Sequence, residues 1–504
     1  MQPPPRIILR ATALAATFAL VLTACGQKEG VHDLSIAGGT TTDGTTTGPA
    51  ATGETTGSDT TDTTGDDAGT DTTDTTGGDD TTGTTGGTTG TTGGGSTTGG
   101  TTTTGGSTTG DGSTTDGSGE TTGASTGGPA TPQGSDRTGV EEDAIHLAIH
   151  APVTGAAPLP TTSFEQARDT YWRFLEGQGT KVLGRSKVLV EFKDDKYDPN
   201  SARQACRELE ARAFIVVGGG GTDQIQACGQ FAGVAQFPYF SAGVTEEGLT
   251  GNPWYFASSM TYRQQGPLLA QYVSKNLSGQ KVAMIVTDTP NFDDAVAGWE
   301  QGVQQYGIDY FETMKHPKGD TSWYNSFAKR LYDNGVGVVY ILSSPVDYIR
   351  FAQQAKQQGP GFQYVGVGIT MGLNAVLGSG CDQVDGGIFF SPFPGLDVID
   401  QLDPSFKQAS QAQGAPADDI ALALWGIARQ EHELFLRYER AFGNDLTRED
   451  FRGMAEQSQG IETNVFPTVS YTPQDHFGAD AVHVLQADCA SGQHKTLATF
   501  KSSF

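Results

Sequence analysis

The chain has 504 residues, and its 58 acidic residues against 31 lysines and arginines give a formal net charge of −27 at pH 7. This acidic balance argues against nucleic acid as a partner, because nucleic-acid-binding proteins present basic surfaces to the phosphates. The part from about residue 143 to the end is long enough for two α/β domains with substantial cores.

The first 24 residues predict a secretory signal peptide. Arg6 and Arg10 precede a short, mostly apolar run over 11–22, and a bilayer span would need about 20 apolar residues. The sequence Leu-Thr-Ala-Cys over 22–25 then matches the lipobox of bacterial lipoproteins, with Cys25 as the lipidated residue. The alternative is an ordinary signal peptide whose apolar region ends at a cysteine. The prediction is export to the cell envelope, followed by lipid anchoring to a membrane on its periplasmic or extracellular face.

Residues 25–142 predict the anchor cysteine and a disordered tether. From about residue 40 to 138 the chain is almost entirely Thr, Gly, Asp and Ser, and the only basic residue within 31–139 is Arg137. A segment with no apolar periodicity cannot offset the entropy lost on folding, so it is expected to stay flexible. Its threonines also permit O-glycosylation, whereas a plain spacer is the simpler interpretation.

Strands and helices alternate through the remainder of the chain. Repeated βα units of this kind predict an α/β fold with parallel sheets covered by helices on both faces. The predicted strands lie at 145–150, 187–193, 214–217, 238–241, 282–287, 308–314, 336–342 and 364–367. The rhythm restarts after about residue 260, which suggests two similar lobes. Helices are predicted at 164–175, 200–212 and 224–234.

The turn at 218–222, Gly-Gly-Gly-Gly-Thr, is the first candidate for a binding site. A strand enters it and a helix leaves it, so a ligand could approach the backbone and meet free N–H groups. A dinucleotide fingerprint would need glycine where the chain has Asp223, and a Walker A loop would need Gly-Lys-Ser/Thr, which is also absent. A tight structural turn is the alternative.

No catalytic or metal-binding set has a recognisable spacing. Neither an HExxH motif nor a G-x-S-x-G elbow occurs. His146 and His150 are therefore expected to be structural or to lie at the surface, and His476 to hold a loop together. We expect no enzyme activity, metal or cofactor. Four cysteines follow Cys25, an even number that predicts two disulfides in an oxidising compartment, with three possible pairings; four free buried thiols are the alternative. They are Cys206, Cys228, Cys381 and Cys489.

The ordered set of segments resembles the branched-chain amino-acid (leucine/isoleucine/valine-binding) type of periplasmic solute-binding protein of ABC importers. The segments that carry the resemblance are 145–155, 192–195, 198–199, 216–222, 238–245, 280–288, 320–341 and 446–451. The likeness covers roughly 143–504 and implies the type I fold of that family. In this fold two Rossmann-like lobes are joined by three crossovers, here near 257–263, 389–394 and 464–470, with the ligand cleft between the lobes. The first lobe would take 143–258 plus 392–465, and the second 259–391 plus 466–504.

The resemblance also implies site residues. Thr222 matches the position that holds the ligand carboxylate, Phe292 matches an aromatic residue of the second lobe, and Ser344 falls where the family often has tyrosine. Backbone and hydroxyl groups would come from Gly243, Val244 and Thr245. The acid that pairs with a ligand ammonium should fall near Gly368, where the chain has none, and the tyrosine of the first loop is also missing, with Pro160 nearby. A ligand without a cation, or a polar neutral one, is thus as well supported as an amino acid.

Placed on these lobes, the cysteines predict two pairs. Cys206 and Cys228 lie on neighbouring first-lobe helices that flank the strand at 214–217, and Cys381 would then tie the second lobe to Cys489 in the C-terminal segment.

The function implied by the resemblance is that of a lipid-anchored, extracytoplasmic receptor. It would bind a small polar ligand, an amino acid or a related compound, and deliver it as a monomer to the permease subunits of an ABC importer, without catalysing a reaction. One alternative is a sensory or regulatory lipoprotein of the same fold without a permease. Another is an exported α/β enzyme.

Overall fold

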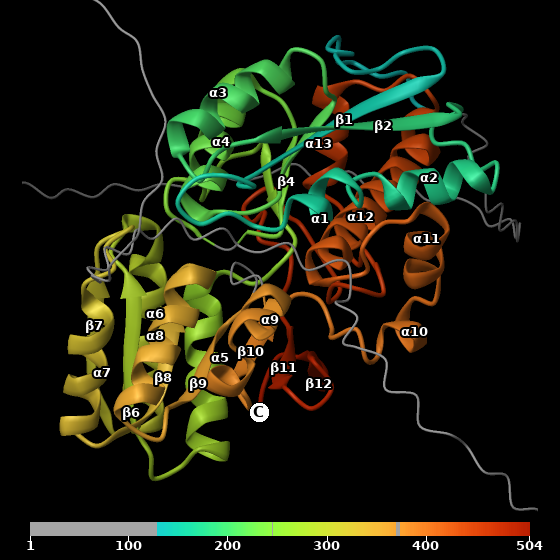
Figure 1. Ribbon diagram of the computed structural model, residues 1–504. Coiled ribbons are helices and arrows are strands. Elements are labelled where there is room, and N and C mark those ends of the chain that lie inside the picture. Colours follow the sequence, from blue (N-terminus) through green and yellow to red (C-terminus); the bar gives the residue numbers. More distant parts are fainter. Residues whose placement is uncertain (1–128, 244, 369–372) are drawn as a thin grey trace, which may run out of the picture. The chain divides into compact units, whose positions relative to one another are not determined.

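The computed structural model describes residues 129–243, 245–368 and 373–504 (Figure 1). The predicted signal peptide, Cys25, most of the predicted tether and Val244 lie outside the described residues. The described part contains two sheets, one of five strands and one of seven. We call the five-stranded sheet with its helices the first lobe, and the seven-stranded sheet with its helices the second lobe. This arrangement confirms the predicted α/β fold class.

The five strands of the first lobe are all parallel, in the order β2-β1-β3-β4-β5. They are β1 (Ala144–Ala151), β2 (Lys187–Asp194), β3 (Ile215–Gly218), β4 (Tyr239–Ser241) and β5 (Tyr255–Ala257). The strand order reverses between β1 and β3. In open parallel sheets a ligand binds beyond the carboxyl ends of the strands at such a reversal, and this point coincides with the glycine turn that follows β3.

Alternate residues of the first-lobe strands face two different helix layers. Leu147 and Ile149 of β1 pack with α1, α2, α12 and α13, whereas Ala148 packs with α3 and α4. This period of two is what a strand with both faces buried requires. The helices are α1 (Thr161–Glu165), α2 (Thr170–Gly177), α3 (Pro199–Glu210), α4 (Thr222–Ala235), α12 (Asp419–Phe442) and α13 (Arg448–Ala455).

The second lobe has the strand order β12-β11-β10-β9-β8-β6-β7. Its strands are β6 (Lys281–Thr287), β7 (Tyr310–His316), β8 (Val336–Leu342), β9 (Gln363–Val367), β10 (Ile388–Ser391), β11 (Val482–Asp488) and β12 (Gln493–Lys501). Strands β6 to β10 are parallel, and β11 and β12 add an antiparallel edge. Strands β5, β10, β11 and β12 were not predicted from the sequence.

Helices cover both faces of the second sheet as well. Ala283 and Ile285 of β6 pack with α7, α8 and α9, and Met284 on the other face packs with α5 and α6. The remaining elements are α5 (Tyr262–Asn276), η1 (Pro290–Phe292), α6 (Asp293–Tyr306), α7 (Trp323–Asp333), α8 (Pro345–Gln358), α9 (Leu373–Val384), α10 (Ile399–Leu402) and α11 (Ser405–Gln413).

Two expected boundaries differ from the structure. The helix predicted at 164–175 is two helices, α1 and α2. The chain also returns to the second lobe later than the expected 464–470, because Tyr471 still packs in the first-lobe core and Phe477 pairs in parallel with Ala257 at the end of β5. The transfer therefore falls between Gly478, whose N–H still bonds to Ala257, and β11. Apolar side chains of this loop, such as Tyr471, hold it in the first-lobe core. Because they do not alternate with the period of two of a strand, the sequence pattern did not predict this boundary.

Both predicted disulfides are present in the structure. Cys206 on α3 bonds to Cys228 on α4, with a Cα–Cα distance of 5.9 Å, and Cys381 on α9 bonds to Cys489 after β11 at 5.5 Å. The first links two neighbouring helices of one layer. The second closes a loop of more than a hundred residues, for which chain-entropy arguments predict a larger restriction of the unfolded chain.

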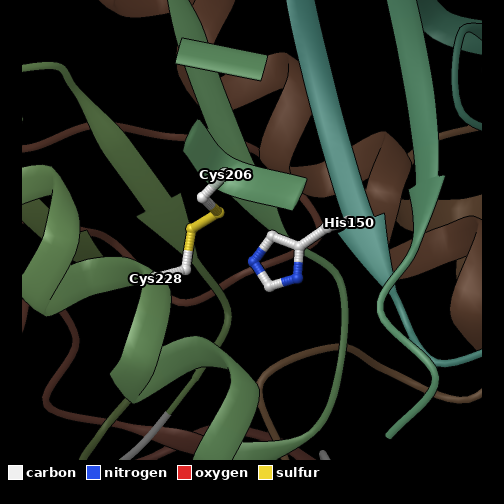
Figure 2. A group of neighbouring side chains, drawn as sticks. All are labelled: His150, Cys206 and Cys228. Atoms are coloured by element: carbon white, nitrogen blue, oxygen red, sulfur yellow. A yellow bond between two sulfur atoms is a disulfide. The ribbon is translucent and has the colours of Figure 1, made fainter. Parts of the chain in front are cut away.

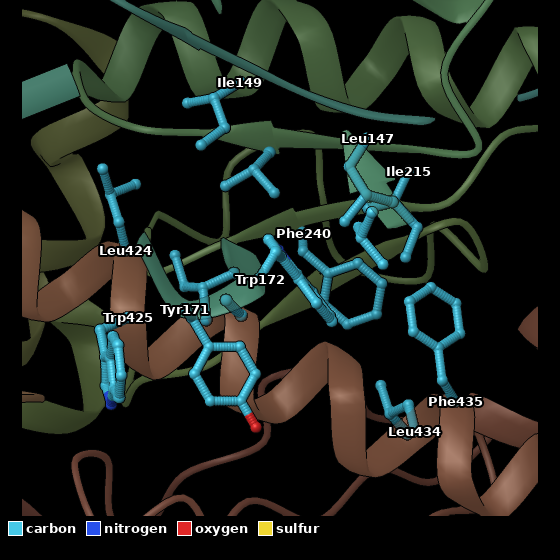
Figure 3. Packing of buried hydrophobic residues seen from close by; sticks show 14 of the residues in the cluster. Leu147, Ile149, Tyr171, Trp172, Ile215, Phe240, Leu424, Trp425, Leu434 and Phe435 are labelled. Atoms are coloured by element: carbon cyan, nitrogen blue, oxygen red, sulfur yellow. The ribbon is translucent and has the colours of Figure 1, made fainter. Parts of the chain in front are cut away.

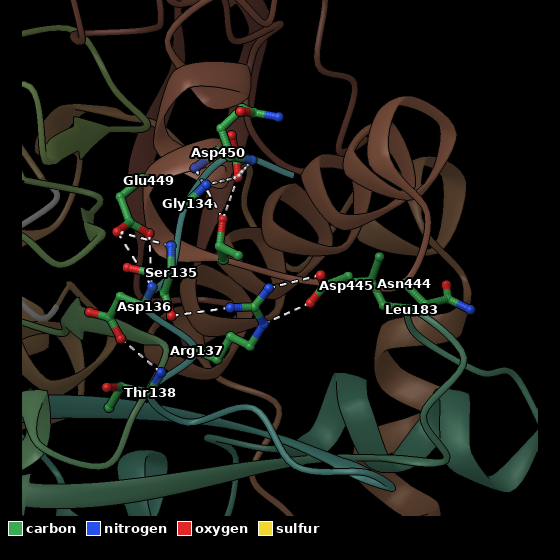
Figure 4. Close-up of polar contacts among 12 residues, drawn as sticks. Gly134, Ser135, Asp136, Arg137, Thr138, Leu183, Asn444, Asp445, Glu449 and Asp450 are labelled. Atoms are coloured by element: carbon green, nitrogen blue, oxygen red, sulfur yellow. Dashed lines mark hydrogen bonds and ion pairs between the residues drawn. The ribbon is translucent and has the colours of Figure 1, made fainter. Parts of the chain in front are cut away.

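The segment before β1 packs against the C-terminal part of the first lobe, although the tether was expected to run to residue 142 (Figure 4). The backbone N–H of Gly134 donates to the Asp450 carboxylate at 2.7 Å, and the N–H of Asp136 donates to Glu449 at 3.2 Å. Arg137 forms a two-pronged ion pair with Asp445 at 2.7 and 2.8 Å. The carboxylates of Glu449 and Asp450 at the start of α13 thus hold the segment before β1 in place. The sequence did not show which groups these carboxylates would bind.

The core between the first sheet and α12 is rich in large aromatic side chains (Figure 3). Tyr171 packs edge-on to Trp425 with ring centroids 4.9 Å apart, and Phe240 stacks on Phe256 at 5.0 Å. Within this core lies a carboxyl group, Glu431 of α12, which is 2% exposed and has one oxygen without a hydrogen-bond partner. Burial raises the pKa of Glu431 to about 8. Arg168 lines the same small cavity, but its guanidinium donates to the carbonyl groups of Val190 and Glu165.

This buried acid predicts a pH dependence of stability. The folded protein keeps the Glu431 proton up to about pH 8, whereas the unfolded chain loses it near the ordinary value of about 4.3. The free energy of unfolding should therefore fall as the pH rises between these two values. Glu431→Gln should remove this slope and stabilise the protein at pH 8 by a few kcal/mol, with little effect at pH 4.5. Urea unfolding at the two pH values measures this.

The control is Glu433→Gln, on the same helix, because Glu433 is partly exposed and pairs with Arg437. An equal effect of Glu431→Gln at both pH values would contradict the prediction.

Candidate functional site

The glycine turn after β3 is closely surrounded by other parts of the first lobe. Gly221 has a φ of +77°, a conformation that side-chain-bearing residues rarely adopt. A Cβ atom on Gly219 would lie 2.7 Å from the Phe164 ring and 3.2 Å from the carbonyl oxygen of His150. Glycine is therefore needed for the chain to pass between β1 and α1 before α4 begins at Thr222.

Three of the predicted site residues lie on the walls of one cleft between the lobes. Thr222, the first residue of α4, comes from the first lobe, and Phe292 and Ser344 come from the second. Thr222 is 7% exposed, and no hydrogen bond of its hydroxyl is found among the described residues. Its hydroxyl and the N–H groups of the first helical turn thus face a space that both lobes border. The other residues of this cleft are Pro152, Ala157, Leu159, Tyr197, Gly221, Ser343 and Pro345.

An apolar hollow adjoins this cleft and shares Leu159 and Gly221 with it. Its free space, with its open mouth, is about 630 Å³. On one side lies the glycine turn with Gly243, another predicted site residue, and on the other lies the face of α12 that carries Ile420, Leu424 and Ile427. The cleft and the hollow together offer polar groups at one end and aliphatic walls at the other.

Ser343 and Ser344 are held on the cleft wall by a buried polar network in the second lobe. Asp347 accepts hydrogen bonds from the Ser344 hydroxyl at 2.7 Å and from the Tyr324 hydroxyl at 2.7 Å. Ser343 lies 2.9 Å from Nε2 of His316, and burial lowers the pKa of this histidine, so its ring is neutral at pH 7. Nδ1 of His316 faces the carbonyl of Pro317 at 3.1 Å and must donate to it. Nε2 is thus an acceptor, and the hydroxyls of Ser343 and Thr287 both lie near it, while the Ser343 hydroxyl can also donate to the Asp347 carboxylate at 3.3 Å.

Thr245 lies elsewhere than the sequence analysis implied. Its side chain is fully buried, and its hydroxyl donates to the carbonyl of Asn291 at 3.2 Å, in the second lobe. It lines neither the cleft nor the hollow. The structure therefore gives Thr245 a contact between the lobes, and Val244 lies outside the described residues.

Asp223, in the first turn of α4, joins the two lobes. Its carboxylate accepts a hydrogen bond from the Asn291 amide at 2.5 Å and an ion pair from Lys318 at 2.7 Å, and both partners belong to the second lobe. The Lys318 ammonium also lies over the Tyr197 ring, 4.1 Å from its centre. Because Lys318 offsets its charge, Asp223 does not leave an unpaired anion beside Thr222.

An acid in the apolar hollow, Asp419, was not predicted from the sequence; it is the first residue of α12. It is 9% exposed, and its carboxylate accepts a hydrogen bond from the backbone N–H of Asn374, in the second lobe, at 3.2 Å. Burial, with the neighbouring charge of Asp418, raises the pKa of Asp419 to about 7. The sequence showed only an Asp-Asp pair before an apolar helix, which is typical of a helix N-terminus.

Another group of chemically active side chains lies on the face of the first sheet that α3 and α4 cover (Figure 2). His150, Cys206 and Cys228 are close enough to hold a metal ion, but the two sulfurs form a disulfide and are not thiolates. Both ring nitrogens of His150 are also engaged, at 2.8 Å from Asp195 and 2.8 Å from the Tyr239 hydroxyl. These contacts fit the structural role expected for His150. His476 likewise donates to the carbonyl of Tyr255 at 3.0 Å and stacks on Phe256.

Within the described ranges, the structure has no helix that is both long enough and apolar enough to cross a bilayer.

Comparison with solved structures identifies the fold. A fatty acid ABC transporter substrate-binding protein from Thermomonospora curvata is 18% identical, with a TM-score of 0.63 over 74% of this chain and 97% of that one. A solute-binding protein of an ABC transporter from Rhodopseudomonas palustris, in complex with 3,4-dihydroxybenzoic acid, is 17% identical, with a TM-score of 0.59 over 72% and 99%. A branched-chain amino acid ABC transporter protein from Thermus thermophilus with bound valine is 16% identical, with a TM-score of 0.59 over 72% and 98%. At these identities the likeness concerns the fold alone.

No curated protein matches the sequence. The sequence profile described as periplasmic binding protein matches residues 144–493, which include both lobes, the glycine turn and the cleft. The predicted type I resemblance is thereby confirmed, and the chain belongs to the periplasmic binding protein family.

Proposed function

We propose that this chain is the extracytoplasmic, lipid-anchored receptor of an ABC importer, which binds a small molecule between its two lobes and delivers it to the permease. The observation that carries the proposal is the cleft itself. It lies at the strand-order reversal of the first sheet, and both lobes contribute to its walls. Solved relatives of this fold are named as binding proteins of ABC transporters.

The walls of the cleft and the hollow suit a ligand that has both a polar end and an apolar body. The polar end would meet Thr222 and the start of α4, and the apolar body would lie between the glycine turn and α12. The ligands named for the solved relatives, a fatty acid, a dihydroxybenzoic acid and valine, each combine a carboxylate with an apolar part. A thermal-shift screen of such compounds tests the proposal, since a ligand at 100 times its Kd adds about 2.7 kcal/mol of stability.

One observation favours a catalytic alternative. Ser343 lines the cleft, and its hydroxyl lies 2.9 Å from the acceptor nitrogen of a neutral histidine whose other nitrogen is held by a carbonyl group. This is the contact that a serine nucleophile needs from its base. Turnover of a bound ester or amide that Ser343→Ala abolishes would support an exported hydrolase, whereas binding without product formation supports the receptor.

The first prediction concerns Thr222. A hydrogen bond to a charged ligand group contributes about 1.5–3 kcal/mol, so Thr222→Ala should weaken the binding of a ligand from the screen roughly ten- to a hundredfold. The melting temperature of the ligand-free protein should change little, because the Thr222 hydroxyl has no partner among the described residues. Isothermal calorimetry measures the affinity. The exposed Thr468, which bonds to Glu462 away from the cleft, supplies the control Thr468→Ala, and wild-type affinity in Thr222→Ala would refute this placement of the polar end.

The second prediction concerns closure of the lobes. Asp223→Ala removes contacts with both Asn291 and Lys318, at a cost of about 1 kcal/mol to the closed arrangement, so the lobes should separate about five times more often. Hydrogen–deuterium exchange should rise several-fold in peptides that cover the start of α4 and η1. Asp293→Ala is the control, because Asp293 pairs with Lys315 within the second lobe. Unchanged exchange in Asp223→Ala would show that these contacts do not hold the lobes together.

The third prediction concerns the anchor. Acyl chains hold a protein to a membrane by about 0.8 kcal/mol per buried methylene group, so Cys25→Ser should move the exported protein from the membrane fraction to the soluble fraction. Ser35→Ala, a change beyond the lipobox, should leave it in the membrane. Fractionation followed by immunoblotting measures the distribution, and continued membrane association of Cys25→Ser would exclude lipidation at this cysteine.

A further inference from the structure

Asp419 is the one charged side chain among the described residues that line the cleft and the apolar hollow. Lysine, arginine and histidine are absent from both sets of lining residues. A ligand that reaches the α12 end of the hollow therefore meets a carboxyl group surrounded by Ile420, Leu424 and Phe393. An ionised carboxylate among aliphatic groups is costly unless a partner charge or hydrogen bond compensates it.

The protein itself supplies Asp419 with hydrogen bonds but with no opposite charge. The backbone N–H groups of Asn374 and, at the start of α12, of Asp419 and Ile420 interact with the carboxylate. The titratable groups around it add no cation at neutral pH. Asp418 is negative, and His494, which lines a smaller cavity beside Asp419, has its pKa lowered to about 4 by burial.

We infer that Asp419 determines the specificity of the cleft by pairing with a protonated amine, and that the ligand is accordingly a hydrophobic amine with an aliphatic or aromatic body. This inference rests on the proposed binding function and adds the class of ligand. The resemblance implied an acid near Gly368 for this role, where the chain has none. Asp419, which the first lobe contributes on the opposite wall, would take that role. Because Asn374 of the second lobe bonds to the same carboxylate, an amine bound there also lies at the contact between the lobes.

The geometry decides against an anion at this end of the hollow. A ligand carboxylate placed beside Asp419 would face a like charge with no described cation in reach, whereas the start of α4 offers N–H groups at the other end. An alcohol could donate to Asp419 but would leave the carboxylate charge unneutralised. Probes that carry an amine, an alcohol or a carboxylate on the same apolar body therefore distinguish these three kinds of ligand.

The test uses the mature protein and three matched series of probes. These are hexylamine, hexanol and hexanoate; phenethylamine, 2-phenylethanol and 3-phenylpropanoate; and isoamylamine, isoamyl alcohol and isovalerate. We expect the amine of at least one series to bind most tightly in calorimetry. Asp419→Asn should weaken its binding by about tenfold or more, the loss expected for one hydrogen bond to a charged group. Asp382→Asn, an exposed acid on α9 outside both sets of lining residues, should bind like the wild type.

The pH profile provides a readout that a merely structural role of Asp419 would not give. Aliphatic amines stay protonated between pH 5.5 and 8, whereas the Asp419 carboxyl takes up a proton below about pH 7. Amine affinity should therefore fall as the pH is lowered through this range in the wild type and stay level in Asp419→Asn. Circular dichroism of Asp419→Asn shows whether the fold is retained, and Asp419→Glu, which keeps the charge, should retain amine binding better than Asp419→Asn.

The outcomes distinguish this inference from the proposed function. If carboxylates or alcohols bind in preference to amines and depend on Thr222, the amine inference is wrong and the receptor function stands. Equal amine affinity in the wild type and Asp419→Asn also overturns the inference. If none of the nine probes binds, the hydrophobic-amine class is excluded, and the wider thermal-shift screen then decides the receptor function by itself.

Discussion

Parallel strands place their carboxyl ends at one edge of a sheet, so the loops that follow them gather there. In the first lobe this edge carries the glycine turn, which passes so close to β1 and α1 that side chains are excluded from it. The exposed backbone and the start of α4 are consequences of this close approach. The cleft, the apolar hollow beside it and the Asp223 contacts with the second lobe are all built around the same turn.

The two walls of the site are supported by different forces. In the first lobe, aromatic packing between the sheet and α12 fixes the helix face that lines the hollow. In the second lobe, a network of hydrogen bonds around Asp347 and His316 fixes Ser343 and Ser344. A rigid wall on each side allows a ligand to be recognised by the approach of two preformed surfaces, which is the hinge-closure behaviour of two-lobed receptors.

Two buried acids on α12 have carboxyl groups whose charge the surrounding protein does not fully compensate. Glu431 in the core and Asp419 at the hollow lie on one helix, twelve residues apart, and burial raises the pKa of both. Glu431 faces other side chains of the core, so its cost can appear only in stability. Asp419 borders a space that a small molecule can enter, so the same cost can be repaid by a ligand. The two acids differ in whether they border the hollow, so Glu431 affects stability and Asp419 can contribute to ligand recognition.

The sequence by itself determined the α/β class, the positions of the long buried strands and both disulfide pairs, because these depend on local periodicity and on cysteines carried by neighbouring elements. The strand–turn–helix junction visible in the chain also pointed to the glycine turn that ends at Thr222, whereas Phe292 was expected only from the family resemblance. Only the tertiary structure showed the antiparallel edge strands, the packing of residues 134–137 against 445–450, the use of Thr245 between the lobes and the place of Asp419. Residues 134–137 and 445–450 lie more than 300 residues apart in the sequence, Thr245 meets a residue of the other lobe, and the place of Asp419 depends on which face of α12 meets an open space. None of these three features is encoded in a local pattern.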